Sequence, residues 1–150
     1  MRELLFKIRK VNQTLINAPK GHFQEVWDEF DRIHYVDPAE EAEKEMTQLL
    51  YKLGQNEEFF FLMTLKERGV SQRMLEDIHK SLVVEAAFVA EIEAHQKSYW
   101  NESLSEVERE VSGELAKEAL NKLYEAKEKT TLYKEAYAEF IWDIYVRLDV

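Results

Sequence analysis

The chain has no cysteine among its 150 residues. This absence excludes disulfide bridges, thiolate metal sites and a cysteine nucleophile, and it favours a reducing compartment. No apolar run approaches the roughly 18 residues that a membrane span requires, and the N-terminus lacks the apolar region of a signal peptide. We therefore expect a cytoplasmic protein that neither crosses nor binds a membrane.

Proline and glycine are also scarce, with two and four copies, while 45% of the residues are hydrophobic and 12% are aromatic. Such a chain has enough apolar surface to fold alone, despite its net charge of -10. The length favours a single domain over residues 1–150. No segment shows the sustained alternation typical of strands, whereas apolar residues recur every three or four positions along most of the chain.

The few glycines and prolines, together with capping residues, divide this helical pattern into segments. Asp37 is expected to cap one helix and Gly54 to end it in a left-handed conformation, and Ser71 is expected to open a helix of about 30 residues. The pattern is compatible with a further helix break near Thr130 and also with a helix that continues through it. The predicted fold is all-α, a compact bundle of about six or seven helices with one long central helix. The predicted segments are residues 4–18, 23–36, 37–54, 56–69, 71–101, 103–123 and 133–148.

Charge is distributed unevenly along the chain. Residues 25–45 contain nine carboxylates and two basic residues, which gives this region a local charge of -7. An acidic face of this kind favours association with a basic partner, although it is also typical of a solvated surface. The candidate partner-binding carboxylates are Glu25, Asp28, Glu29 and Glu41.

Aromatic residues supply a second candidate binding surface. Residues 59–61 are three consecutive phenylalanines, which sweep about 200° of a helix, so one buried face cannot hide all three. Trp142 similarly lies off the apolar stripe of the last helix. Either these helices are covered on most sides, or residues such as Phe60 and Trp142 meet a partner protein or a second copy of the chain.

The segment of residues 65–78 resembles the helix-turn-helix of bacterial regulators. It has a Gly-Val-Ser turn at residues 69–71, followed by apolar residues six and nine positions after the glycine. The resemblance implies DNA binding, with Gln72 and Arg73 reading base edges and Lys80 near a phosphate. The alternative is a simple helix stop at Gly69 followed by a cap at Ser71.

A third interpretation is metal binding. Glu76 and His79 have the Glu-x-x-His spacing of one half of a ferritin-like di-iron site, and Asp31 with His34 imitates it. Only one true Glu-x-x-His pair is present, so we expect no metal or other cofactor. The chain also lacks a glycine-rich phosphate loop and a glycine-flanked serine, which disfavours an enzyme.

The leading hypothesis is therefore a small acidic helical protein that acts by protein–protein binding, as a regulator, inhibitor or adaptor, without catalysis. DNA binding through residues 65–80 is the alternative, and a metal-binding bundle is the third.

Overall fold

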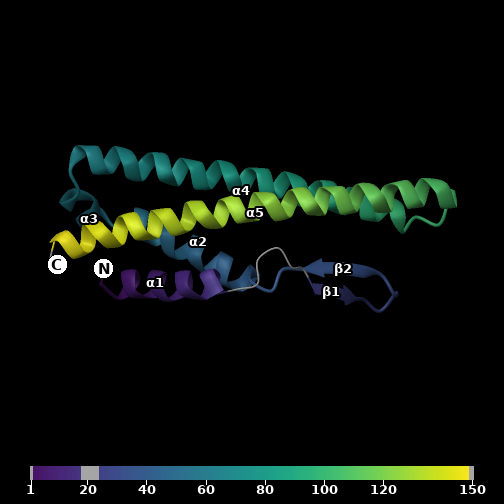
Figure 1. Ribbon diagram of the computed structural model, residues 1–150, viewed down its shortest axis with the longest axis horizontal. Coiled ribbons are helices and arrows are strands. Elements are labelled where there is room, and N and C mark those ends of the chain that lie inside the picture. Colours follow the sequence, from purple (N-terminus) through teal and green to yellow (C-terminus); the bar gives the residue numbers. More distant parts are fainter. Residues whose placement is uncertain (1, 18–23, 149–150) are drawn as a thin grey trace.

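The computed structural model of the protein describes residues 2–17 and 24–148. This part of the chain contains five helices and two strands (Figure 1). The predicted all-α class fits this mostly helical chain, but the predicted count of six or seven helices is wrong. The elements in order are α1 (Arg2–Asn17), β1 (Gln24–Trp27), β2 (Ile33–Val36), α2 (Glu40–Gly54), α3 (Glu57–Leu62), α4 (Leu65–Tyr99) and α5 (Glu106–Leu148).

The first helix follows its predicted pattern. Leu5, Ile8, Val11 and Leu15 form one buried stripe on α1 because their spacing brings them to the same helical face. The Asp37 carboxylate accepts a hydrogen bond from the Ala39 backbone, in the turn just before α2. The helix itself begins at Glu40, two residues later than expected.

The predicted end of α2 is wrong in one respect. Gly54 is the last helical residue, and the C-cap Gln55 keeps a right-handed backbone with φ -85° and ψ -6°. No left-handed residue is needed there, because the backbone N–H of Gln55 still reaches the carbonyl oxygen of Tyr51. Asn56 then caps α3 as predicted, since its side chain accepts a hydrogen bond from Phe59.

A β-hairpin replaces the helix predicted over residues 23–36. Strands β1 and β2 are antiparallel, with Trp27 paired to Ile33 and Val26 paired to His34. The loop is fixed by Asp28, whose Oδ1 atom accepts hydrogen bonds from the backbones of Phe30 and Arg32. The prediction failed because the valines, isoleucine and aromatics of this segment suit a strand as well as a helix.

The break predicted at Gly69 is absent. Helix α4 begins at Leu65, behind a capping box in which Thr64 and Glu67 exchange hydrogen bonds. It then runs without interruption for 35 residues, so Gly69 and Ser71 lie inside it. The long central helix is therefore confirmed, but it starts six residues before the expected cap.

The sixth and seventh predicted segments form one helix. The α5 helix has 43 residues and passes through Thr130, whose hydroxyl donates to the carbonyl oxygen of Ala126 within the helix. Its N-terminus is held by Ser105, which accepts a hydrogen bond from Glu108, whereas the expected cap Ser103 bonds Asn101 instead.

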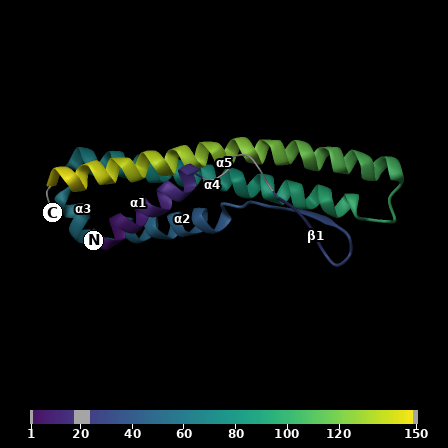
Figure 2. The same cartoon turned by 60° about the horizontal axis from the view of Figure 1, so that its bottom comes forward.

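The two long helices are antiparallel and form the axis of the molecule (Figure 1). We call residues 88–99 of α4 and 106–124 of α5 the outer half of this pair, and the remainder the inner half. Helices α1, α2 and α3 cover the inner half, and the β-hairpin lies beside the outer half (Figure 2). The larger apolar core is in the inner half, with Met46, Tyr137 and Ile141 at its centre. A smaller core in the outer half contains Ile92, Ala119, Leu120 and Leu123.

Candidate functional site

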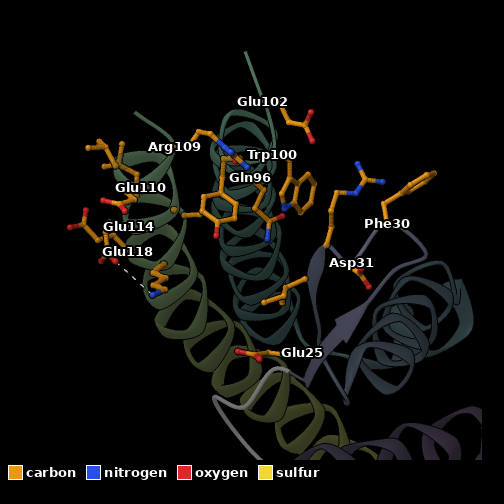
Figure 3. Close-up of a pocket in the computed structure, with 18 of the residues that line it drawn as sticks. Glu25, Phe30, Asp31, Gln96, Trp100, Glu102, Arg109, Glu110, Glu114 and Glu118 are labelled. Carbon is orange, nitrogen blue, oxygen red and sulfur yellow. Dashed lines mark hydrogen bonds and ion pairs between the residues drawn. The ribbon is translucent and has the colours of Figure 1, made fainter. Parts of the chain in front are cut away.

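A large open groove lies between the β-hairpin and the outer half of the α4–α5 pair. Its volume is about 1370 Å³. We call it the acidic groove, and its lining comes from residues 25–33, 96–102 and 107–118. Figure 3 shows the three elements that form it, with the hairpin and α5 on either side of the end of α4.

Apolar side chains are exposed on both walls of the acidic groove. On the hairpin wall, Trp27 is 61% exposed and Phe30 is 68% exposed. On the α5 wall, Val107, Val111 and Leu115 are 69%, 54% and 40% exposed and recur every four residues, so they form one stripe. Large apolar residues gathered at an open groove mark a surface that binds something.

The groove carries an excess of negative charge. Six carboxylates line it and only three basic residues do. Each cation is already engaged within the protein, because Arg109 donates to the Tyr99 carbonyl at 2.8 Å, Arg32 contacts Asp28 at 2.9 Å and Lys117 lies 3.7 Å from Glu114. The lining carboxylates are Glu25, Asp31, Glu102, Glu110, Glu114 and Glu118.

Contacts with Trp100 hold the hairpin beside the helices. The His34 ring lies 5.1 Å from the Trp100 ring, and the Arg32 guanidinium lies 5.0 Å from it. Both side chains are fixed in turn by Asp28, at 2.8 Å from His34 and 2.9 Å from Arg32. The hydrogen bond with His34 is the largest factor that holds the pKa of Asp28 below its ordinary value. The hairpin wall is thus anchored to α4 by an ionic and aromatic cluster.

Gly113 has a specific role in the floor of the groove. A Cβ atom at this position would lie 3.0 Å from Cδ2 of Tyr99. The ring of Tyr99 therefore packs directly on the α5 backbone, which explains a glycine inside a long helix despite its cost of about 1 kcal/mol there.

The predicted partner-binding residues do not gather at one place. Glu25 lines the acidic groove, Asp28 is used within the hairpin loop, and Glu29 and Glu41 are exposed outside the groove. Phe60 is 41% exposed on α3, in the inner half, as expected from the three phenylalanines, of which only the first is buried.

Trp142 is half-buried against α1 in the inner half. Its ring packs edge-on against Phe6 at 5.5 Å, and the Arg9 guanidinium covers it at 4.3 Å. The sequence does not identify the aromatic residues at the groove, because Trp27 and Trp100 fall within segments predicted as helices, residues 23–36 and 71–101. Val107, Val111 and Leu115 fall within the predicted helix over residues 103–123, whose spacing does not show that this stripe is exposed.

Residues with the helix-turn-helix resemblance lie on a straight segment of α4. Gln72, Arg73 and Lys80 are exposed; the first two are adjacent, and Lys80 lies about two turns further along the helix. The crossing of two helices at Gly69, on which this way of reading DNA depends, is not present because α4 is continuous.

The candidate metal ligands are divided between two regions. Asp31 and His34 belong to the hairpin, whereas Glu76 and His79 line a second groove of about 510 Å³ between α2 and α4. Across residues 2–17 and 24–148, no three histidine or acidic side chains are grouped so that they could hold a metal ion. The two pairs therefore do not combine into the site that their spacing suggested.

A buried ionic cluster joins α2 to the long helices. The Lys127 ammonium lies 3.0 Å from Asp37, 3.0 Å from Glu43 and 3.6 Å from Glu85. Burial opposes its charge, but Glu43 and Asp37 raise the pKa of Lys127 above its ordinary value. This cluster is a structural link in which three carboxylates share one cation. Lys134 is buried nearby, and its burial lowers its pKa.

No protein-family model matches the chain, and neither a curated protein nor a solved structure matches it. None of the helices in the described ranges has both the length and the apolarity that crossing a bilayer demands. The geometry of the acidic groove is therefore what points to a function.

Proposed function

We propose that this protein binds a segment of another protein in the acidic groove and acts through that association without catalysis. The observation that carries the proposal is the exposure of Trp27, Phe30 and Val111 around a groove of about 1370 Å³. Aromatic residues are enriched at protein interfaces, where a few buried anchors provide most of the binding free energy.

The dimensions of the groove favour a polypeptide over a small molecule. Pockets for small ligands are typically about 300–1000 Å³ and enclose most of the ligand. The acidic groove is larger, and it lies between two separate walls. Its six carboxylates also disfavour nucleic acid, because phosphates would be repelled along the whole rim.

The hairpin contacts favour a preformed site. Asp28, Arg32 and His34 hold the loop in one conformation, and Trp100 anchors the loop to α4. A groove that is already formed loses less conformational entropy on binding, which leaves more of the contact free energy for affinity.

Selection from a display library of random peptides tests this proposal. We expect selected peptides to bind the wild-type protein and to lose at least about tenfold in affinity for the Val111→Arg variant, which places a bulky cation in the groove. Leu132→Arg is the matched control, because Leu132 is 59% exposed on the same helix but does not line the groove. Peptides that bind all three proteins equally, or a library that yields no binder, would contradict the proposal.

A further inference from the structure

We infer that the segment bound in the acidic groove is a basic amphipathic helix of about three turns, lying along α5 of this protein. The inference rests on the proposed function, and it specifies the shape and the charge of the partner. It follows from three features of the outer half: an incomplete helical layer, an apolar stripe with helical spacing, and a row of carboxylates beside that stripe.

The incomplete layer is visible when the two halves of the molecule are compared. In the inner half, α1 packs along the end of α5, where Phe6 and Arg9 contact Trp142. In the outer half, the hairpin continues the row of α2 (Figures 1 and 2). The residues that line the acidic groove include the start of α5. A partner helix in the groove would cover α5 there as α1 covers it in the inner half.

The apolar stripe has the length of a short helix–helix contact. The stripe spans nine residues from Val107 to Leu115, and these eight steps of 1.5 Å give a length of about 12 Å. Side chains spaced by four residues form the ridges that pack into the grooves of a neighbouring helix. A helix about 10 Å across and 15 Å long occupies roughly 1200 Å³, which is close to the volume of about 1370 Å³ in the acidic groove.

The carboxylate row specifies the charge of that helix. Glu110, Glu114 and Glu118 are exposed on successive turns of α5 and are among the residues that line the groove. Figure 3 shows them on the side of α5 that faces away from the hairpin. Like charges four residues apart destabilise a helix by a few tenths of a kcal/mol per pair. Of these three carboxylates, only Glu114 has a basic partner within the described part of the chain. That partner is Lys117, and both side chains are largely exposed to solvent. A partner with lysine or arginine on successive turns would neutralise this row.

The opposite wall adds two further carboxylates, Glu25 and Asp31, and an aromatic anchor. Glu25 and Trp27 lie two residues apart on β1, so they share the face of the strand that lines the groove. A helix lying along α5 would therefore meet the apolar stripe and, beside it, the carboxylate row, and the hairpin wall would add negative charge nearby. Its apolar face would point into the groove, and its basic residues would flank that face.

Three synthetic peptides of equal length test the shape and charge of the partner. The first is an amphipathic helix with leucines at helical spacing and lysine and arginine on the flanks. The second rearranges the same residues into a strand-like alternation, and the third replaces every basic residue by glutamate. Fluorescence anisotropy should give the basic helix at least about tenfold tighter binding than either other peptide, with affinity falling as salt rises.

Two triple variants locate the binding. The groove variant E110K/E114K/E118K should bind the basic helix at least about tenfold more weakly and should gain affinity for the glutamate peptide. The control variant E125K/E128K/E139K makes the same change in net charge at exposed α5 positions outside the groove, and it should retain more of the affinity. If the lysine groove variant does not fold, E110Q/E114Q/E118Q with its matched glutamine control provides the same comparison.

The outcomes separate this inference from the proposed function. The inference of a basic helix would be overturned if the strand-like peptide bound as tightly as the basic helical peptide. It would also be overturned if the groove variant and the control variant lost the same affinity for the basic helical peptide. If library peptides bound in a Val111-dependent manner but were neither basic nor helical, the inference would be wrong and the proposed function would stand. If no peptide depended on Val111, both would fail.

Discussion

The Ser71 hydroxyl lies 2.9 Å from the Tyr137 hydroxyl, inside the interface between α4 and α5. Both residues are buried, and burial raises the pKa of Tyr137 above its ordinary value. The bond joins two helices across 66 residues of sequence and places Ser71 in a helix interior. A serine expected to open a helix instead joins the two longest helices of the protein.

Removing the Ser71 hydroxyl should destabilise the protein. Ser71→Ala leaves the buried Tyr137 hydroxyl without this partner, and an unsatisfied buried group costs about 1–3 kcal/mol. Urea denaturation would measure the change in the free energy of unfolding. The double variant Ser71→Ala with Tyr137→Phe should cost less than the sum of the single variants, because the unpaired hydroxyl is also removed. Strict additivity would show that the two hydroxyls do not interact.

Replacing Lys127 should lower the free energy of unfolding by more than Ser71→Ala does. Lys127→Met leaves Asp37 and Glu43 partly buried without the cation that neutralises them. Removing one partner of a buried ion pair costs about 3–5 kcal/mol, and partial exposure of this cluster places the expected loss near the lower value, about 3 kcal/mol. Denaturation at neutral pH measures it, and a loss below about 1 kcal/mol would contradict the structural role of the cluster.

The effect of Lys127→Met should depend on pH. In the wild-type protein, burial raises the pKa of Asp37. Hydrogen bonds from the Ala39 backbone and from Lys127, together with the charge of Lys127, outweigh this effect, so the pKa of Asp37 is below its ordinary value of 3.8. A lowered carboxyl pKa contributes stability above the unfolded pKa, and that stability is lost as the pH falls through the folded pKa. The difference between variant and wild type should therefore shrink as the pH falls from about 7 to about 4. If the difference in unfolding free energy between Lys127→Met and wild type stayed constant from about pH 7 to about pH 4, Lys127 would not be what lowers the pKa of Asp37.

Replacing Lys134 should leave the stability unchanged or increase it, in contrast to replacing Lys127. It is 3% exposed, and burial lowers its pKa, although Glu43 and Glu85 oppose this shift. Replacing a charged group buried at such a cost by an apolar one of similar size is neutral or stabilising, so Lys134→Met should raise the free energy of unfolding by about 0–2 kcal/mol. A lowered lysine pKa means that wild-type stability recovers as the pH rises toward 10.5, so the gain should be smallest at about pH 10. If the gain in unfolding free energy from Lys134→Met grew as the pH rose, the pKa of Lys134 would not be lowered in the folded protein.

Sequence patterns predicted the fold best where one helical face is apolar and the other polar. The spacing of Ile8, Val11 and Leu15 predicts α1 for this reason, and all three are buried in it. The pattern failed at residues 24–36, where Val26, Trp27 and Ile33 suit either periodicity, and the Asp28 loop decides in favour of a hairpin. It also failed at residues 69–71, where contacts with a distant helix outweigh the local breaking tendency of glycine.

The acidic groove could be predicted only in part. Local composition indicates an acidic region and a surplus of aromatic residues, and Glu25, one of the predicted binding residues, lines the groove. The site itself brings together the hairpin, the end of α4 and the start of α5, which are separated by up to about 90 residues. Their meeting depends on His34 and Arg32 packing against Trp100, a tertiary contact that no local pattern specifies.

The indole N–H resonances of the three tryptophans provide the most direct test of the central claim. Trp27 and Trp100 line the acidic groove, and Trp142 lies in the inner half against α1. In a ¹⁵N–¹H correlation spectrum recorded during titration with the basic helical peptide, we predict that the Trp27 and Trp100 indole signals shift together and that the Trp142 signal does not. A Trp142 signal that shifts while the other two stay unchanged would contradict binding in the groove and would place the partner on the last turns of α5.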